Sequence, residues 1–235
     1  RDKYEEYTKI FPAMFTVLDH KFCVGDPMVL FMEGKHVNVP VMSGNTSDEF
    51  PSYIEASSKE DLKKKAEEIF GKNAETFLRF PEAMQEDSDG KYAKVNGIEC
   101  TIKCLFSEKK SAGEKKPYYY YRFDPDIPGW DNAGTFHSVD LWFFFETLAK
   151  CWRPFVGQHY DLSRMMCNYW VNFIKTGDPN GNDADGKPMP YWYPYEKEKP
   201  CEMIFMSDRP VVNCGWVTPF KEFLQEQIKK TLPIG

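Results

Sequence analysis

The sequence predicts an α/β protein with an open, mostly parallel sheet flanked by helices. Runs of strand-forming residues lie far apart in the chain, and segments with helical periodicity separate them. This pattern is typical of helices that connect strands of one sheet. The chain has 235 residues, of which 42% are hydrophobic and 16% aromatic. Its length fits one large domain or two small ones, with a sizeable core.

Three segments have the composition of β-strands. The first lies at 37–42 and ends at a Gly-Asn turn. Pro40 within it indicates a strand start or an edge position, because proline has no N–H for a ladder hydrogen bond. The run Pro117–Phe123 has the strongest strand signal in the chain, since its successive tyrosines favour β-structure. A last short strand is expected at Met203–Met206.

Helices are predicted where apolar residues recur at a spacing of three or four and where typical helix-end residues flank them. The clearest is 160–176, which keeps this spacing along its length and which Gly177 terminates. A serine pair can cap a helix over 59–70, and Thr218 can cap a C-terminal helix. The other helical segments expected are 28–33, 73–86 with a break near Pro81, 95–107 and 141–148.

The composition limits the kind of partner. The formal net charge is −6 and no basic stripe stands out, which argues against binding to nucleic acid. No apolar run approaches the ~20 residues that cross a bilayer, so we expect a soluble protein, cytoplasmic or secreted, with no membrane span. The seven cysteines are scattered without a Cys-x-x-Cys pair. The sequence therefore predicts no metal site and no cofactor.

A candidate acid and a candidate base follow two of the predicted strands. Asp48 and Glu49 come after the Gly-Asn turn of the first strand, and His137 ends the loop behind the tyrosine strand. Loops that follow neighbouring parallel strands emerge at one edge of the sheet, so the carboxylate and the imidazole can meet there. A histidine held by a buried carboxylate is a good general base. The spacing does not choose between Asp48 and Glu49.

The serine that such a pair would activate is missing from the sequence. The strand-to-helix elbow G-x-S-x-G does not occur. Ser43 lies on the acid's own strand, and Ser138 is too close to His137 in the chain for a productive geometry. In the order serine, acid, histidine, the serine belongs before residue 1. Because the first residue is arginine rather than methionine, we expect a preceding segment that is encoded separately or has been removed.

Four stretches resemble the C-terminal portion of the type-B carboxylesterases, the family that includes the cholinesterases. They occur in the family's order and cover most of residues 20–220. The stretches are DPMVLFMEGKHVNVP, VPVMSGNTSDEF, GTFHSVDLWFFF and SRMMCNYWVNFIKTGDPNG. The resemblance implies that residues 1–235 are the C-terminal part of a carboxylesterase-type α/β-hydrolase domain, with an open, mostly parallel sheet flanked by helices. That fold would be incomplete without an N-terminal segment.

The resemblance also implies roles for single residues. Glu49, the second acid of the Asp-Glu pair, would be the triad acid, and His137 would be the base. Ser52 and Tyr53 match positions that line the substrate pocket. Most of the aromatic run behind the histidine is expected to be core, and Trp142 is the member of that run that we expect to touch substrate.

Three further features bear on the comparison with the family. Phe50 departs from the glycine that is common after the glutamate, so the local backbone is expected to differ. Some relatives pair two cysteines at positions that correspond here to Cys100 or Cys104 with Cys214. Asn45 opens an N-x-S/T sequon, and its place beside the acid loop predicts a buried, unmodified side chain.

The predicted function is that of a serine-type carboxylesterase acting on small-molecule esters. This chain would supply the glutamate and the histidine of a Ser-Glu-His triad. An N-terminal segment or partner subunit would supply the serine and the oxyanion loop, so the isolated chain is expected to be inactive. The alternative is a non-catalytic, cholinesterase-like interaction module, but a binding surface needs neither Glu49 nor His137. In a third reading the chain does not fold alone, because its sheet would have a bare edge.

Overall fold

The computed structural model describes residues 19–49, 52–87 and 90–232. The chain divides into two compact units. One unit comprises the residues up to Asn38 together with the C-terminal end, and the other runs from Val39 to Thr231. The second unit contains both sheets and every residue considered as a site.

Helix α2 (Pro27–Met32) belongs to the first unit and matches the helical turn expected near 28–33. The Asp26 carboxylate caps it by accepting hydrogen bonds from the N–H groups of Met28 and Val29. Pro27 occupies the first helical position, where a backbone N–H has no partner within the helix.

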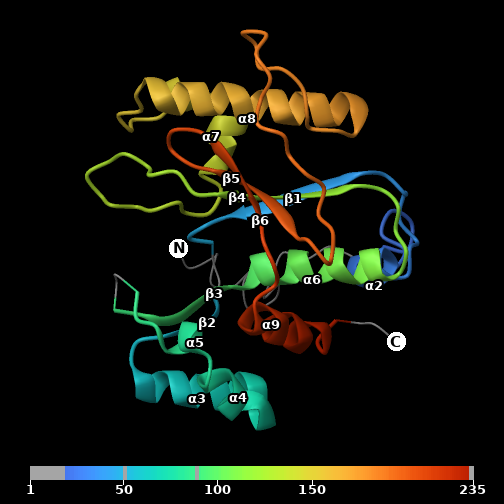
Figure 1. The fold of residues 1–235 in the computed structure, drawn as a ribbon, viewed down its shortest axis with the longest axis vertical. Coiled ribbons are helices and arrows are strands. Elements are labelled where there is room, and N and C mark those ends of the chain that lie inside the picture. Colours follow the sequence, from blue (N-terminus) through green and yellow to red (C-terminus); the bar gives the residue numbers. More distant parts are fainter. Residues whose placement is uncertain (1–18, 50–51, 88–89, 233–235) are drawn as a thin grey trace. The chain divides into compact units, whose positions relative to one another are not determined.

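The second unit is built on a four-stranded sheet (Figure 1). Its strands, in spatial order, are β1 (Val41–Thr46), β4 (Tyr118–Phe123), β5 (Cys201–Phe205) and β6 (Pro210–Cys214). β1, β4 and β5 are parallel, and β6 is antiparallel to β5. The predicted open, mostly parallel sheet is therefore confirmed, with β6 as an additional strand. The first strand starts later than expected, directly after Pro40, since proline cannot donate to the ladder.

The tyrosine strand β4 is buried on both faces. Tyr119, Tyr121 and Phe123 belong to the core cluster that includes residues of α8. Tyr118 packs on Phe106 of α6, with ring centroids 4.7 Å apart. Alternate residues of a strand point to opposite faces, so a strand with helices on both sides needs apolar bodies at every position. This explains why the run shows no alternation of apolar and polar residues.

A second, two-stranded antiparallel sheet consists of β2 (Ser52–Ala56) and β3 (Tyr92–Asn96). Neither strand was predicted from the sequence. They are short and their pairing contains register irregularities, and Ala93 has a positive φ of 50°. The helix expected from residue 95 begins at Gly97 instead. Asn96 ends β3 and caps that helix, accepting a hydrogen bond from Glu99 N at 3.0 Å.

The helices of the second unit lie close to their predicted positions. They are α3 (Lys59–Phe70), α4 (Ala74–Leu78), α5 (Pro81–Met84), α6 (Gly97–Ser111), α7 (Asp140–Phe144), α8 (Gly157–Thr176) and α9 (Pro219–Lys229). The segment 73–86 breaks at Pro81, as expected. The segment 141–148 does not continue as one helix, because Glu146 adopts a left-handed φ of 49° that ends α7.

The cysteine pairing implied by the family resemblance is wrong. Cys214 forms a disulfide with Cys201, whereas Cys100 and Cys104 are free thiols. Cys201 and Cys214 are direct partners across the β5–β6 hairpin. Because β6 was not predicted, these two cysteines were not expected to lie side by side. Cys104 lies on α6, where its Sγ contacts the carbonyl of Gln225 at 3.5 Å.

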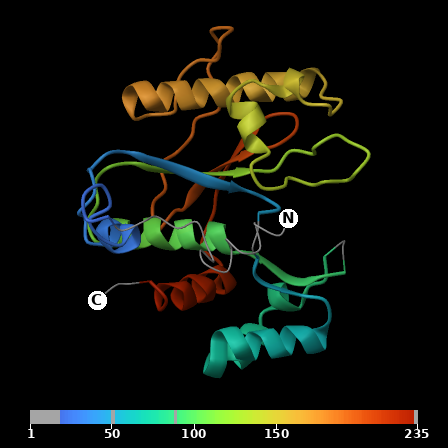
Figure 2. The ribbon, with the colours of Figure 1, turned by 180° about the vertical axis from the view of Figure 1, so that it is seen from behind.

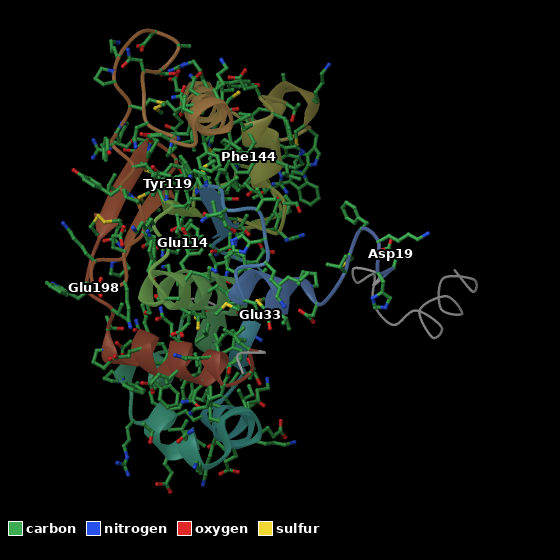
Figure 3. The ribbon with its side chains drawn as sticks, turned by 90° about the vertical axis from the view of Figure 1, so that its right-hand side faces the viewer. Asp19, Glu33, Glu114, Tyr119, Phe144 and Glu198 are labelled. Atoms are coloured by element: carbon green, nitrogen blue, oxygen red, sulfur yellow. A yellow bond between two sulfur atoms is a disulfide. The ribbon has the colours of Figure 1, made fainter. Side chains whose placement is uncertain are left out.

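Helices cover both faces of the four-stranded sheet, with α7 and α8 on one face and α6 on the other (Figures 1 and 2). The side chains of Tyr119 and Phe144 lie in the packed layer between the sheet and α8 (Figure 3). A second core cluster joins the β2–β3 sheet to α3, α4 and α9. The four-stranded sheet is therefore packed between helices on both faces. This packing fixes the direction in which the loops after β1 and β4 leave the sheet.

Candidate active site

The loops after β1 and β4 emerge at the same edge of the sheet. Thr46 and Phe123 are partners at the ends of these two parallel strands. Beyond them Ser47 N donates to the carbonyl of Phe123 at 2.9 Å. Farther on, Asp48 forms an isolated parallel bridge with Phe136. The loop that follows β4 therefore returns to the acid loop just before it delivers His137.

Glu49 and His137, 88 residues apart, are in hydrogen-bond contact through Glu49 Oε1 and His137 Nδ1. A carboxylate can only accept, so Nδ1 carries the proton and Nε2 is the ring nitrogen able to take one up. Thr46 Oγ1 donates to the other carboxylate oxygen at 3.1 Å. The Glu49 side chain is 7% exposed and the His137 side chain 52%. A buried acid thus orients a ring that remains accessible.

Asp48, the rival acid, turns to the other loop. Its Oδ2 accepts hydrogen bonds from Thr135 N at 2.9 Å and from Thr135 Oγ1 at 3.2 Å. The adjacent carboxylates therefore have different duties: Glu49 contacts the histidine, and Asp48 holds the backbone that leads to it.

A further carboxylate, that of Asp140, lies close enough to Glu49 for the two charges to interact. Asp140 begins α7 and is 8% exposed. Tyr121 Oη donates to Asp140 Oδ2 at 3.1 Å. Burial raises the pKa of the Asp140 carboxyl, and the nearby charge of Glu49 raises it further, although the Tyr121 hydrogen bond opposes both. Asp140 lies in the segment GTFHSVDLWFFF, but no role was predicted for it from the sequence. Its position three residues after His137, at the start of an apolar helix, was the available signal.

The residues proposed to line the pocket fall in two places. Trp142 lies on α7, partly buried against Phe136 and Phe155, with ring centroids 5.8 and 6.3 Å apart. Trp142 follows His137 closely in the chain and packs against the core cluster that includes residues of α8. Its contact with substrate stays a prediction.

Ser52 and Tyr53 lie on β2 and help to line an open depression. Ser52 Oγ donates to Glu55 Oε2 at 3.1 Å. Tyr53 packs edge-on against Phe70 of α3, with centroids 5.9 Å apart, and belongs to the second core cluster. Their role in binding substrate also stays a prediction. Phe50 lies outside the described residues.

The sequon asparagine is buried, as expected. Asn45 is 3% exposed, and its side chain contacts Tyr120 Oη and donates to Thr46 O at 2.8 Å. Within residues 19–49, 52–87 and 90–232, no group of three or more histidine, cysteine, aspartate or glutamate side chains is arranged to hold a metal ion. Among the helices described there, none has both the length and the apolar character needed to span a bilayer.

Comparison with known proteins gives one family match. The sequence model of the Carboxylesterase family matches residues 95–213, just over half of the chain. The matched segment includes His137, whereas Glu49 lies before it.

Curated relatives agree with this match. Carboxylesterase 4A of Bos taurus is 27% identical over 234 residues, covering 87% of this chain and 40% of that protein. Cocaine esterase of Homo sapiens is 23% identical over 217 residues, covering 81% of this chain and 38% of the relative. Bile salt-activated lipase of Rattus norvegicus is 32% identical over 103 residues, 42% of this chain and 16% of the lipase. The chain thus spans about 40% of the length of the first two relatives.

Solved structures confirm the fold. A thermophilic PNB esterase is similar over 96% of this chain and 46% of its own, with a TM-score of 0.58 and 23% sequence identity. Another PNB esterase covers 93% of this chain and 44% of its own, with a TM-score of 0.55 and 24% identity. These similarities identify the arrangement of sheet and helices as part of an α/β-hydrolase fold.

Proposed function

The chain belongs to the carboxylesterase family, and we propose that it supplies the acid and the base of a Ser-Glu-His triad that hydrolyses carboxylic esters. In this proposal residues 1–235 are the C-terminal part of a carboxylesterase-type domain. Glu49 is the acid and His137 is the base. The serine nucleophile and the oxyanion loop come from a segment N-terminal to this chain or from a partner subunit.

The contact between Glu49 and His137 carries the proposal. A buried carboxylate on Nδ1 fixes the tautomer of the ring and stabilises the imidazolium that forms when Nε2 takes up a proton. The two residues come from loops 88 residues apart that meet at the carboxyl edge of parallel strands, the usual place for a site in an open α/β sheet. Thr46 holds the second oxygen of the acid, so the carboxylate is fixed from both sides.

In the first half of the reaction the serine hydroxyl attacks the ester carbonyl carbon while His137 Nε2 accepts its proton. A C–O bond forms, and the carbonyl electron pair moves to oxygen as a tetrahedral intermediate develops. When that intermediate collapses, the bond to the alcohol oxygen breaks, and this oxygen receives the proton from His137. The products of this half are the free alcohol and an acyl-serine.

In the second half water replaces the alcohol. His137 accepts a proton from the water as its oxygen attacks the acyl-serine, and returns the proton to the serine oxygen when the C–O bond to serine breaks. The sum of both halves is ester plus water giving acid plus alcohol. Throughout, Glu49 stays ionised and keeps the ring oriented, so it exchanges no proton with the substrate.

We take the substrate class to be small-molecule carboxylic esters. The names of three relatives, a carboxylesterase, a cocaine esterase and a bile salt-activated lipase, all denote enzymes that cleave ester bonds. The half-exposed ring of His137 fits a site that a small ester can reach. Trp142, Ser52 and Tyr53 are the proposed contacts of the acyl or alcohol group.

The proposal is tested with the natural full-length protein that contains this chain and p-nitrophenyl acetate as substrate. The His137→Ala variant should lose activity by a factor on the order of 10⁴ to 10⁶. Glu49→Gln should lose less, because the ring then keeps a partner that cannot stabilise its charge. The matched control is His20→Asn, since His20 is an exposed histidine in the first unit.

Full activity of His137→Ala would refute the role of this residue. A wild-type protein that is folded but does not hydrolyse any of a panel of p-nitrophenyl esters would refute the esterase assignment and leave the interaction module as the better reading. Circular dichroism of each variant separates a loss of catalysis from a loss of fold.

A further inference from the structure

We propose that Asp48 is a positioning residue, whose carboxylate holds the loop of His137 in register with Glu49. The inference rests on the proposed function, because the register matters only if Glu49 and His137 act together. It assigns to the first member of the Asp-Glu pair a duty distinct from that of the second. In this inference Asp48 affects the reaction through its contacts with Thr135, which join the two loops.

The contacts of Asp48 join the two loops directly. Its Oδ2 accepts from both Thr135 N and Thr135 Oγ1, and its own N–H lies 3.3 Å from Thr135 O and from Thr135 Oγ1. Thr135 is buried, at 4% exposure. Hydrogen bonds that a carboxylate accepts from backbone N–H groups are short and strong. We call these contacts between Asp48 and Thr135 the clasp. The clasp therefore fixes both the distance and the direction between the loops.

The backbone at Gly134, directly before Thr135, leaves room for the Asp48 carboxylate. Gly134 has a φ of 62°, a conformation that side-chain-bearing residues rarely adopt. A Cβ atom at this position would overlap Asp48 Oδ2. The glycine therefore allows a close approach of the Asp48 carboxylate to the backbone. An aspartate facing a matched glycine indicates a built contact between the loops.

The clasp is adjacent to both members of the acid–base pair. Asp48 directly precedes Glu49, and one residue, Phe136, separates Thr135 from His137. Phe136 itself pairs with Asp48 in the isolated bridge and packs on Trp142. A shift of the loop at Thr135 would therefore move the imidazole of His137 by a similar distance. Catalytic groups must keep their geometry within a fraction of an ångström, so the clasp is expected to affect turnover.

The kinetic test uses the full-length protein and p-nitrophenyl acetate, with Asp48→Ala, Asp48→Asn and Thr135→Val as variants. Asp48→Ala should lower kcat by about 10- to 100-fold, the cost of a misplaced catalytic group. KM should change much less. Asp48→Asn should restore most of kcat, because an amide oxygen in place of Oδ2 can still accept from Thr135 N and Oγ1. Thr135→Val removes the two contacts of the hydroxyl but keeps the backbone hydrogen bonds, so it should lower kcat less than Asp48→Ala.

The matched control is Asp61→Ala. Asp61 also accepts a backbone hydrogen bond, from Ser57 N at 3.0 Å, but at the start of α3 rather than in the site. This variant should keep the kcat of the wild type. If it lost as much activity as Asp48→Ala, a general effect on folding would explain both results and the inference would fail.

A spectroscopic readout does not depend on activity. The proton on His137 Nδ1, bonded to Glu49, should give a far-downfield proton NMR signal that is absent from His137→Ala. Asp48→Ala should shift or broaden this signal, and Asp48→Asn should restore it.

If Asp48→Ala keeps both the signal and kcat, the inference is wrong while the proposed function stands. An inactive wild type refutes the proposed function, and the NMR signal then still decides whether Asp48 holds the loop. Thr135→Val, which is nearly isosteric, replaces Asp48→Ala in both measurements if the alanine variant does not fold.

Discussion

Replacing Lys103 by methionine should destabilise the protein by about 3 to 5 kcal/mol, because the change leaves a buried carboxylate without its cation. Lys103 projects from α6, and its Nζ lies 2.7 Å from Glu202 on β5 and 2.6 Å from Glu99 on α6. The side chains of Lys103 and Glu202 are 9% and 5% exposed. Water can therefore do little to replace a lost partner.

Burial acts against both charges, and each charge offsets the burial of the other. Burial by itself lowers the pKa of Lys103, but the Glu99 and Glu202 carboxylates raise it above its usual value. Burial by itself raises the pKa of Glu202, but Lys103 and the amide of Asn213, which donates at 2.8 Å, bring it below its usual value. Without Lys103 the burial of Glu202 is opposed by the Asn213 hydrogen bond and by the smaller effect of the Arg122 charge, which together are too weak to offset it.

Urea denaturation of the full-length protein measures this effect. Lys103→Met should lower the free energy of unfolding, and adding Glu202→Gln to the same protein should recover most of the loss, because the remaining partner is then neutral. Arg79→Met is the control: Arg79 and Glu75 lie 3.8 Å apart with both side chains more than 80% exposed, so their separation should have no measurable effect. A Lys103→Met protein as stable as the wild type, or a double variant less stable than the single one, would show that the pair does not act as described.

Two further predictions concern the β5–β6 hairpin and the carboxylate of Asp140. Tryptic peptides of the unreduced protein should contain a link between Cys201 and Cys214, and Cys214→Ser should lower stability by about 2 to 4 kcal/mol; a link from Cys214 to Cys104 would contradict the structure. Asp140→Asn should stabilise the protein increasingly as pH rises above the usual aspartate range. Because burial raises the pKa of Asp140 in the folded state, the folded protein holds a proton that the unfolded chain has already lost, and stability falls as pH increases through that window. Urea midpoints of wild type and Asp140→Asn that run parallel from pH 4 to pH 8 would refute this.

The sequence predicted the features that depend on local composition. Four successive tyrosines identified β4, and helical spacing identified α8, because these segments are buried in the way that their periodicity indicates. It missed β2, β3 and β6, which are short and owe their strand conformation to their partners. The Cys201–Cys214 link was missed for the same reason. Strand pairing is a property of two segments together, so one segment read alone does not reveal it.

In the candidate site, too, some features could be predicted from local sequence, whereas others depend on contacts between distant segments. The order of acid and histidine after two separate strands was enough to predict that the loops share one edge, since the fold class decides where such loops emerge. Spacing alone could not choose between Asp48 and Glu49. That choice depends on which face of the acid loop meets the returning loop, and the meeting point is set by Gly134 and Thr135, more than 80 residues away in the sequence.

Asp48, Glu49 and Asp140 are carboxylates of one site, and what distinguishes them is the kind of donor that reaches each. Asp48 accepts hydrogen bonds from a backbone N–H and a hydroxyl, which join it to the loop before His137. Asp140 receives a tyrosine hydroxyl in a buried setting that raises its pKa, so its ionised form is disfavoured where it would repel the charge of Glu49. Glu49 meets a ring nitrogen that can carry charge, and its other oxygen is held by Thr46. Glu49 contacts a histidine ring that would become positive when it takes up a proton, and this contact is the reason why we propose Glu49 as the acid of the pair.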